Sequence, residues 1–294
     1  MGKVSIGTAP DSWGVWFADD PKQTPWTRFL DEVQTAGYTK IELGPYGYLP
    51  TDPVRLKDEL DQRGLTMTAG TTFEHVHRPG GLESTWQDVF ETAELTAAMG
   101  AKHLVVMPSM WRGEIVEERF DHQGQAEHGR AVTELGRRLA EEFGLQTQYH
   151  PHADGHVDTQ DTVERFLEET DSAFVNLCLD TGHISYCRGD NLELIRKYPD
   201  RIRYVHLKQV DPKILDEVEA EGLSMDEAVR RGVMCEPPNG VPDLPPVLDA
   251  LAGLDVDLFA IVEQDMYPCP PDVPLPIAER TLAYLNSHGG GGSR

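Results

Sequence analysis

Four residues with metal-binding side chains lie towards the ends of short apolar runs in the second half of the chain. They are His150, Asp180, His206 and Glu263, in the runs QTQYHPH, VNLCLDTGH, RYVHLKQV and LFAIVEQD. Two imidazoles and two carboxylates suit Mn²⁺, Co²⁺, Fe²⁺ or Zn²⁺. A helix-patterned stretch separates each run from the next, so a repeated strand–helix fold would bring the four together. The pattern predicts one divalent cation at a shared sheet edge.

Two further polar residues stand close to this set along the chain. His183 comes three residues after Asp180, and Lys208 alternates with His206, so that both can point to the same side of a strand. A lysine beside a metal ion can stabilise an oxyanion, or transfer protons once its pKa falls. We therefore predict Lys208 and His183 as the catalytic proton-transfer residues.

Predicted substrate contacts come from the ends of other expected strands. Trp13, together with Trp16, could form an apolar wall against the C–H faces of a polyol. Glu42 closes the second apolar run, and His75 and His77 follow the third. Each of these three could face the pocket, or could equally be a hydrogen-bonded residue of the rim.

The segment YHPH at 149–152 offers two histidines to the metal. Its proline breaks the regular alternation of side chains, so either histidine could be the ligand. We favour His150 because it ends the regular strand. His152 is then expected to contact substrate.

Eight short apolar runs predict the strands. Most are rich in β-branched or large apolar residues and run into Gly, Pro or polar turns, as buried parallel strands do. The expected strands are 4–9, 40–44, 65–70, 102–108, 145–150, 175–180, 203–208 and 258–263. Helical stretches alternate with them at 24–37, 51–64, 84–100, 121–143, 158–170, 190–198, 243–253 and 274–287.

This alternation predicts a (β/α)8 TIM barrel that forms a single catalytic domain over residues 1–288. All strand carboxyl ends of such a barrel open onto one face, which would place the metal ligands together. A doubly wound open sheet is the alternative, but GTAPDSWG is not its glycine-rich phosphate loop. Residues 211–242 form an insertion between strands seven and eight that could act as a lid. Residues 289–294 are expected to be a flexible glycine-rich tail.

The charge balance argues against polyanionic partners. Fifty acidic residues against 26 basic ones give a formal net charge of −24, which repels phosphate backbones and anionic membranes. Four cysteines without CxxC spacing and the lack of a signal-peptide pattern predict a cytoplasmic protein. No apolar run approaches the roughly 20 residues of a membrane helix. We expect a small-molecule ligand, with no nucleic acid and no membrane as partner.

The strand-end motifs resemble the xylose-isomerase-like barrel superfamily of sugar isomerases, epimerases and dehydratases. Within it, the sequence is most similar to the inosose dehydratase branch. The motifs are APDSWG at 9–14, IELGPYGYLP at 41–50, YHPH at 149–152, LDTGH at 179–183, VHLKQV at 205–210 and VEQD at 262–265. The resemblance implies a homo-oligomer and a cation, Mn²⁺ or Co²⁺ first, held by His150, Asp180, His206 and Glu263.

The resemblance also implies a reaction. Epimerases of the superfamily place glutamates at the ends of strands five and eight as an acid–base pair, whereas this chain has His150 at the first position. We therefore favour a metal-dependent lyase that takes the α-proton from 2-keto-myo-inositol (inosose), a cyclic polyol ketone, and expels the β-hydroxyl as water.

Several alternatives remain beside the lyase. A keto-sugar isomerase or epimerase, or a lyase that eliminates from 3-keto-glycosides, would use the same enediolate. A non-catalytic polyol-binding protein is a further alternative. An abasic-site endonuclease is disfavoured because strand four ends in Met107-Pro108, which offers no ligand, and because the net charge opposes DNA binding.

Overall fold

Eight parallel strands close into a barrel in the computed structural model, which describes residues 2–109 and 119–288. The strands are β1 (Val4–Thr8), β2 (Lys40–Glu42), β3 (Thr66–Glu74), β4 (His103–Pro108), β5 (Gln146–Tyr149), β6 (Val175–Asp180), β7 (Ile202–Leu207) and β10 (Leu258–Val262). They lie in chain order around the barrel, and β10 pairs with β1 to close it. The prediction of a (β/α)8 barrel is confirmed, and the open doubly wound sheet is excluded.

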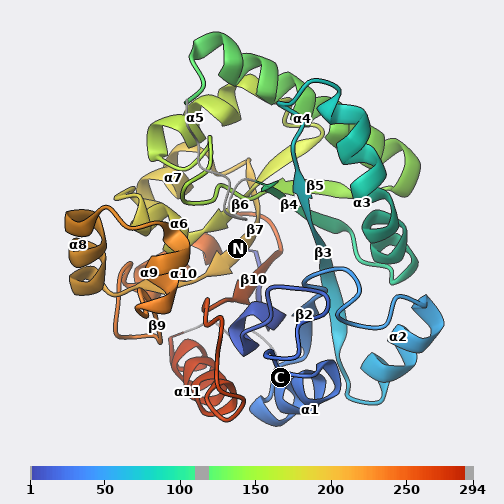
Figure 1. Ribbon diagram of the computed structural model, residues 1–294, viewed down its shortest axis with the longest axis vertical. Coiled ribbons are helices and arrows are strands. Elements are labelled where there is room, and N and C mark those ends of the chain that lie inside the picture. Colours follow the sequence, from blue (N-terminus) through green and yellow to red (C-terminus); the bar gives the residue numbers. More distant parts are fainter. Residues whose placement is uncertain (1, 110–118, 289–294) are drawn as a thin grey trace.

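The helices surround the strands (Figure 1). The eight predicted helices are present as α1 (Trp26–Ala36), α2 (Pro53–Asp61), α3 (Gly81–Ala98), α4 (His122–Phe143), α5 (Gln160–Glu169), α7 (Asn191–Lys197), α10 (Leu244–Ala252) and α11 (Pro274–Ser287). The elements that were not predicted include the 3-10 turn η1 (Pro10–Trp13) and the helix α6 (Thr181–Tyr186). Both directly follow barrel strands, so they shape the face where the strands end.

The inside of the barrel is a packed core. Ala69, Val105, Cys178, Tyr204 and Ile261 form one buried cluster there, and the hydroxyl of Tyr204 lies 2.6 Å from that of Thr68. Side chains fill such barrels, so space for a ligand arises only beyond the strand ends.

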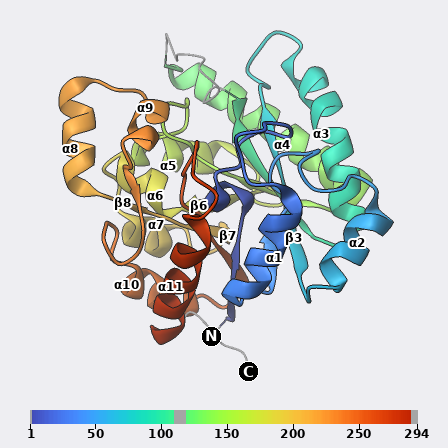
Figure 2. The same cartoon turned by 60° about the horizontal axis from the view of Figure 1, so that its bottom comes forward.

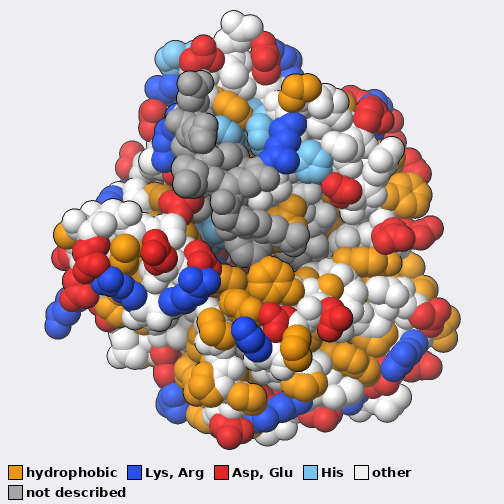
Figure 3. Space-filling model, viewed as in Figure 1, with side chains coloured by type: hydrophobic (Ala, Val, Ile, Leu, Met, Phe, Trp, Pro, Cys, Tyr) orange, Lys and Arg blue, Asp and Glu red, His pale blue; other side chains and the backbone are white. Residues whose placement is uncertain are grey.

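The insertion between β7 and β10 folds into elements of its own. It contains β8 (Gln209–Val210), α8 (Pro212–Glu221), α9 (Met225–Arg230) and β9 (Met234–Cys235), with β8 and β9 paired antiparallel outside the barrel. The two helices stand together beside the barrel at the upper left of Figure 2. Figure 3 shows acidic and basic side chains intermixed on this flank. The sequence did not predict how this segment would dock.

Candidate active site

The four predicted metal ligands converge at the carboxyl end of the barrel. One ligand atom from each of His150, Asp180, His206 and Glu263 lies within 4.8 Å of the other three. His150 Nε2 is 3.2 Å from Asp180 Oδ2, and His206 Nδ1 is 2.9 Å from Glu263 Oε2. The register of β6 and β7 places two of these residues side by side, because Asp180 and His206 are direct partners in the strand pairing. His152 is outside this group, which favours His150 over His152 as the ligand.

The donor set fits a divalent transition metal. Burial alone would raise the pKa of Asp180, but the charge of Lys208 opposes it and helps to hold that pKa well below its usual range. Burial likewise opposes ionisation of Glu263, yet His206 and Lys208 lower its pKa to about 2. Two buried carboxylates that stay anionic beside two imidazoles are the mixture that Mn²⁺, Co²⁺, Fe²⁺ and Zn²⁺ accept.

Glu42 orients one of the two imidazoles. Its Oε1 lies 2.7 Å from His206 Nε2, and its Oε2 accepts a hydrogen bond from Thr71 Oγ1 at 2.9 Å. The Nε2–H of His206 therefore points to Glu42, and Nδ1, which faces Asp180 and Glu263, is the nitrogen that would bind an ion in place of a proton. Carboxylates placed behind histidine ligands fix the tautomer and raise ligand basicity. Glu42 lines the pocket as predicted, but its carboxylate binds His206.

Replacing Glu42 by glutamine is expected to weaken metal binding about 10- to 100-fold, because the neutral amide makes His206 a poorer ligand. A chelator competition titration of the purified variant would measure this. Glu74→Gln is the matched control, because Glu74, at the end of β3, is likewise a buried carboxylate that binds a histidine, with Oε1 2.9 Å from His128 Nε2. Equal metal affinity in both variants would contradict the role of Glu42.

The motif Asp180-Thr-Gly-His183 positions both a ligand and a lysine. Asp180 caps α6, since its Oδ1 accepts the backbone N–H of His183 at 2.7 Å, and its Oδ2 is left for the metal set. Thr181 Oγ1 donates to the carbonyl of Lys208 at 2.7 Å and accepts its backbone N–H at 2.9 Å. A Cβ on Gly182 would lie 2.6 Å from both Cβ and Cγ of Lys208. Only glycine leaves room for this lysine.

Gly182→Ala is expected to displace the Lys208 side chain and to lower the free energy of unfolding by about 1–3 kcal/mol, the usual cost of overpacking. Turnover should fall more than metal content. Urea unfolding and elemental analysis would measure the two effects. Gly124→Ala in α4, where the nearest atom to the new Cβ would be 3.3 Å away, is the control. Turnover like that of the wild type in Gly182→Ala would contradict the steric argument.

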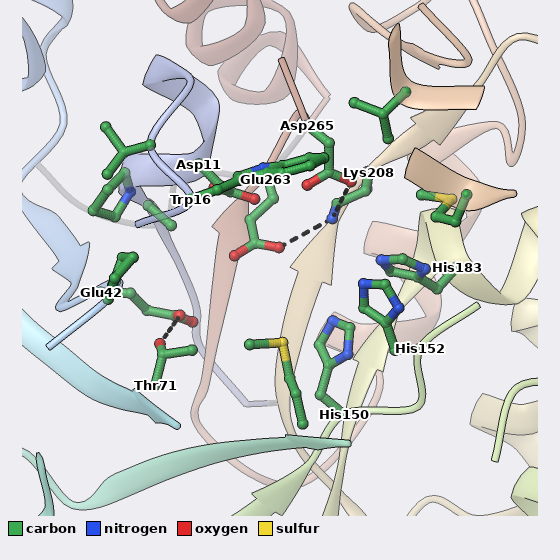
Figure 4. A pocket seen from close by; sticks show the side chains of 18 of the residues that line it. Asp11, Trp16, Glu42, Thr71, His150, His152, His183, Lys208, Glu263 and Asp265 are labelled. Carbon is green, nitrogen blue, oxygen red and sulfur yellow. Dashed lines mark hydrogen bonds and ion pairs between the residues drawn. The ribbon is translucent and has the colours of Figure 1, made fainter. Parts of the chain in front are cut away.

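Lys208 lies among carboxylates at the floor of the pocket. Its Nζ is 3.0 Å from Asp265 Oδ2, 3.2 Å from Glu263 Oε2 and 3.4 Å from Asp180 Oδ2. Figure 4 shows the ammonium group between Glu263 and Asp265. Burial would lower the pKa of Lys208, but Asp180, Asp265 and Glu263 hold it well above its ordinary value. This is opposite to the lowered pKa that a lysine base would need.

His183 and His152 are neutral histidines that line the same pocket. Burial lowers the pKa of His183 well below its usual value and that of His152 to about 3. His183 Nδ1 accepts the backbone N–H of Ala153 at 3.2 Å, so its proton is on Nε2. His152 Nδ1 lies 2.8 Å from the carbonyl of Ala153, so its proton is on Nδ1. His183 can therefore donate a hydrogen bond into the pocket.

The cavity above the metal set has a volume of about 850 Å³, including its part open to solvent. Its polar groups lie on several strand ends, and apolar side chains separate them. The lining includes Asp11, Val15, Trp16, Glu42, Phe73, Met107, His150, His152, Asp154, His183, Lys208, Met225, Asp226, Val229, Glu263 and Asp265.

The predicted place of Trp13 in this wall is wrong. Trp13 is fully buried, its Nε1 donates to Glu32 Oε2 at 2.8 Å, and its ring packs edge-on against Phe29 of α1. The turn η1 rotates Trp13 under α1, whereas Trp16, three residues later, emerges into the cavity.

The structure does not bring His75 and His77 into this cavity. Strand β3 continues to Glu74, beyond the predicted end at residue 70, so the two histidines lie on the turn that follows. His75 Nε2 lies 2.7 Å from Ser84 Oγ, and the ring centroid of His77 lies 5.1 Å from that of His156. Neither lines the cavity.

Asp11 and Asp265 are two of the pocket carboxylates that were not among the predicted site residues. Asp265 lies two residues after Glu263, on the same side, and Asp11 enters from η1 (Figure 4). Burial first, and then the charge of Glu263, raises the pKa of Asp11 well above its ordinary value. The alternation within VEQD could have indicated Asp265, but no spacing in APDSWG distinguishes Asp11 as a pocket residue.

A sequence profile of the xylose isomerase-like TIM barrel family matches residues 30–288. The chain belongs to this family. Among its relatives, the inosose dehydratase of Geobacillus thermodenitrificans (strain NG80-2) is 31% identical over 276 residues, which cover 90% of this chain and 91% of that protein. The inosose dehydratase of Lacticaseibacillus casei is 30% identical over 295 residues, or 97% of each protein.

Solved structures agree on the fold. The probable 3-DHS dehydratase AsbF of Bacillus anthracis superposes with a TM-score of 0.72 at 14% identity and covers 97% of this chain and 99% of its own. The IOLI protein, whose crystal structure contains a zinc atom, has a TM-score of 0.71 at 17% identity over 96% of this chain and 98% of its own. Within residues 2–109 and 119–288, no helix has the length and apolarity to span a bilayer.

Proposed function

We propose that the chain is a metal-dependent hydro-lyase that removes water from 2-keto-myo-inositol. The arrangement that supports this most strongly is the Lys208 ammonium group beside the four-residue metal set, at the floor of the pocket. The relatives named inosose dehydratase match the chain over nearly its whole length. His150 occupies the position where epimerases of the family, by resemblance, carry a glutamate.

His150, Asp180, His206 and Glu263 would hold the ion. Once bound, it would draw electron density from a ketone oxygen and acidify the neighbouring C–H bond. Asp11 faces the same pocket and, among the described residues, is neither in the metal set nor ion-paired with Lys208. The charge of a bound ion would add to that of Lys208 in opposing the raised pKa of Asp11. We propose that the Asp11 carboxylate then accepts the α-proton.

Lys208 acts as the acid in this proposal. The C–H electron pair becomes the new C=C bond, the bond to the β-hydroxyl breaks, and Lys208 supplies the proton with which that hydroxyl leaves as water. The carboxylates around its Nζ keep the lysine protonated until then. His183 donates its Nε2–H to a substrate oxygen and keeps the ring in place.

Incubation of the metal-loaded protein with 2-keto-myo-inositol in deuterated water tests the function. We expect new ultraviolet absorbance from an enolic dione, together with loss of one water by mass spectrometry. Exchange of the α-proton without absorbance would instead identify an isomerase or epimerase. Turnover confined to 3-keto-glycosides would assign the same chemistry to another substrate and contradict the proposal.

A further inference from the structure

One wall of the pocket comes from the insertion rather than from the barrel. Met225, Asp226 and Val229 of α9 line the cavity beside the barrel residues. Met225 and Val229 are each only 5% exposed, so their side chains are packed rather than loose. A ligand above the metal set would therefore meet α9 on one side.

A long-range hydrogen bond fixes the first residue of this helix. Asp154 Oδ2 accepts the backbone N–H of Met225 at 2.7 Å, across 71 positions of the chain. Asp154 lies in the loop after β5 and has a φ of 65°, in the left-handed region that aspartate tolerates better than most residues. Asp154 and Met225 both line the cavity, so the bond lies at the pocket wall.

Apolar packing holds the inner side of the insertion. Ala153, beside Asp154, belongs to one buried cluster with Met225, Val229 and six further residues, and Trp16 packs against this cluster. The six are Val210, Leu215, Val218, Ala228, Val233 and Met234. The barrel loop and the insertion thus share a core.

Ion pairs hold the outer side. Arg188, which follows α6, binds Asp216 at 2.6 Å and Glu219 at 2.8 Å, both on α8. Figure 3 shows the intermixed charges on this flank. The buried cluster and the hydrogen bond from Met225 to Asp154 dock α9 against the barrel loop, and the Arg188 ion pairs dock α8. The lid expected from the length of the insertion stays a prediction.

We propose that α9 is the specificity wall of the pocket. Val229 sets how large a ring substituent fits beside the metal set, and Asp154 positions α9 through Met225. The inference rests on the proposed function, because it takes a ring ketone as the substrate. Asp154 is a positioning residue, whereas Val229 contacts the substrate.

Matched size changes at Val229 test the wall. We expect Val229→Ala to shift the ratio of kcat/KM for a methyl 3-keto-glucoside over that for 2-keto-myo-inositol about tenfold towards the glycoside, and Val229→Phe to shift it about tenfold the other way. Val54, which is 68% exposed on α2, carries the same two substitutions as controls. Identical selectivity in Val229→Ala and Val229→Phe would overturn the proposal.

Two substitutions at Asp154 separate its hydrogen bond from its backbone conformation. Glycine keeps a positive φ and removes the acceptor, while asparagine keeps both. We expect Asp154→Gly to raise KM for 2-keto-myo-inositol about tenfold with kcat within about twofold and unchanged metal content, and Asp154→Asn to behave like the wild type. A fall in kcat or metal content with unchanged KM, or equal KM in both variants, would overturn the positioning role.

Calorimetry can measure the binding of myo-inositol and methyl glucoside to the metal-loaded variants. This measurement distinguishes failure of the proposal for α9 from failure of the proposed function. These polyols lack the ketone and cannot eliminate water. If wild-type protein converts no ketone, the proposed function fails, and the ratio of the two Kd values decides the wall alone. Opposite shifts of that ratio in the two Val229 variants support the wall, and unchanged ratios overturn it.

Discussion

Lys208→Met is expected to lower kcat for dehydration of 2-keto-myo-inositol by at least about 10³-fold while the metal stays bound. A positioned acid contributes roughly 10²–10⁴-fold, and loss of its charge beside a developing oxyanion adds to this. Methionine keeps much of the volume of the buried side chain, so the pocket should keep its shape. Steady-state kinetics with elemental analysis of the same sample would measure both quantities.

Lys213→Met is the control for this substitution, because Lys213 is an exposed lysine on α8. It should leave kcat and metal content unchanged. The elimination step itself can be isolated by α-proton exchange in deuterated water. If Lys208 is the acid, Lys208→Met should still exchange the α-proton but form little dione. Undiminished dione formation would refute its role.

Asp180→Asn is expected to weaken metal binding by at least about 100-fold and to lower turnover by about 10³-fold or more. The metal set loses a charged oxygen at its centre, where Asp180 Oδ2 lies 3.2 Å from His150 Nε2 and 3.4 Å from Lys208 Nζ. Asparagine is as good an N-cap as aspartate, so α6 should remain. Chelator competition and circular dichroism would measure the metal affinity and the fold.

Asp190→Asn is the matched control, because Asp190 caps α7 by accepting the N–H of Glu193 at 2.9 Å. This cap lies on the surface and has no part in the metal set. It should leave metal affinity and turnover unchanged. Tight metal binding in Asp180→Asn would contradict the assignment of this aspartate as a ligand.

The strand ends were predictable because a sequence pattern and a property of the fold together determine where they lie. Buried parallel strands appear as apolar runs, and a closed barrel brings their carboxyl ends to one face. Asp180 and His206 were therefore predicted to meet, and they are register partners. Alternation along one strand likewise placed Lys208 near His206 on the same side.

Predictions failed where a strand ended later than its apolar run or where the chain turned. Residues 71–74 continue β3 as TTFE, a polar stretch that pairs with β4, so His75 and His77 lie beyond the rim. Trp13 and Trp16 are three residues apart, and only the geometry of η1 determines which one is buried. Contacts such as that of Asp154 with Met225 join segments far apart in the sequence, and no local sequence pattern indicates them.

Metal titration of the stripped protein tests the central claim most directly, that these four strand ends hold one ion used for dehydration. Protein freed of metal by a chelator should not convert 2-keto-myo-inositol. Activity should then rise linearly with added Mn²⁺ or Co²⁺ and stop rising at one equivalent per chain, and Asp180→Asn should show no such rise. Full turnover by the stripped protein, or an equal response of Asp180→Asn, would contradict the account.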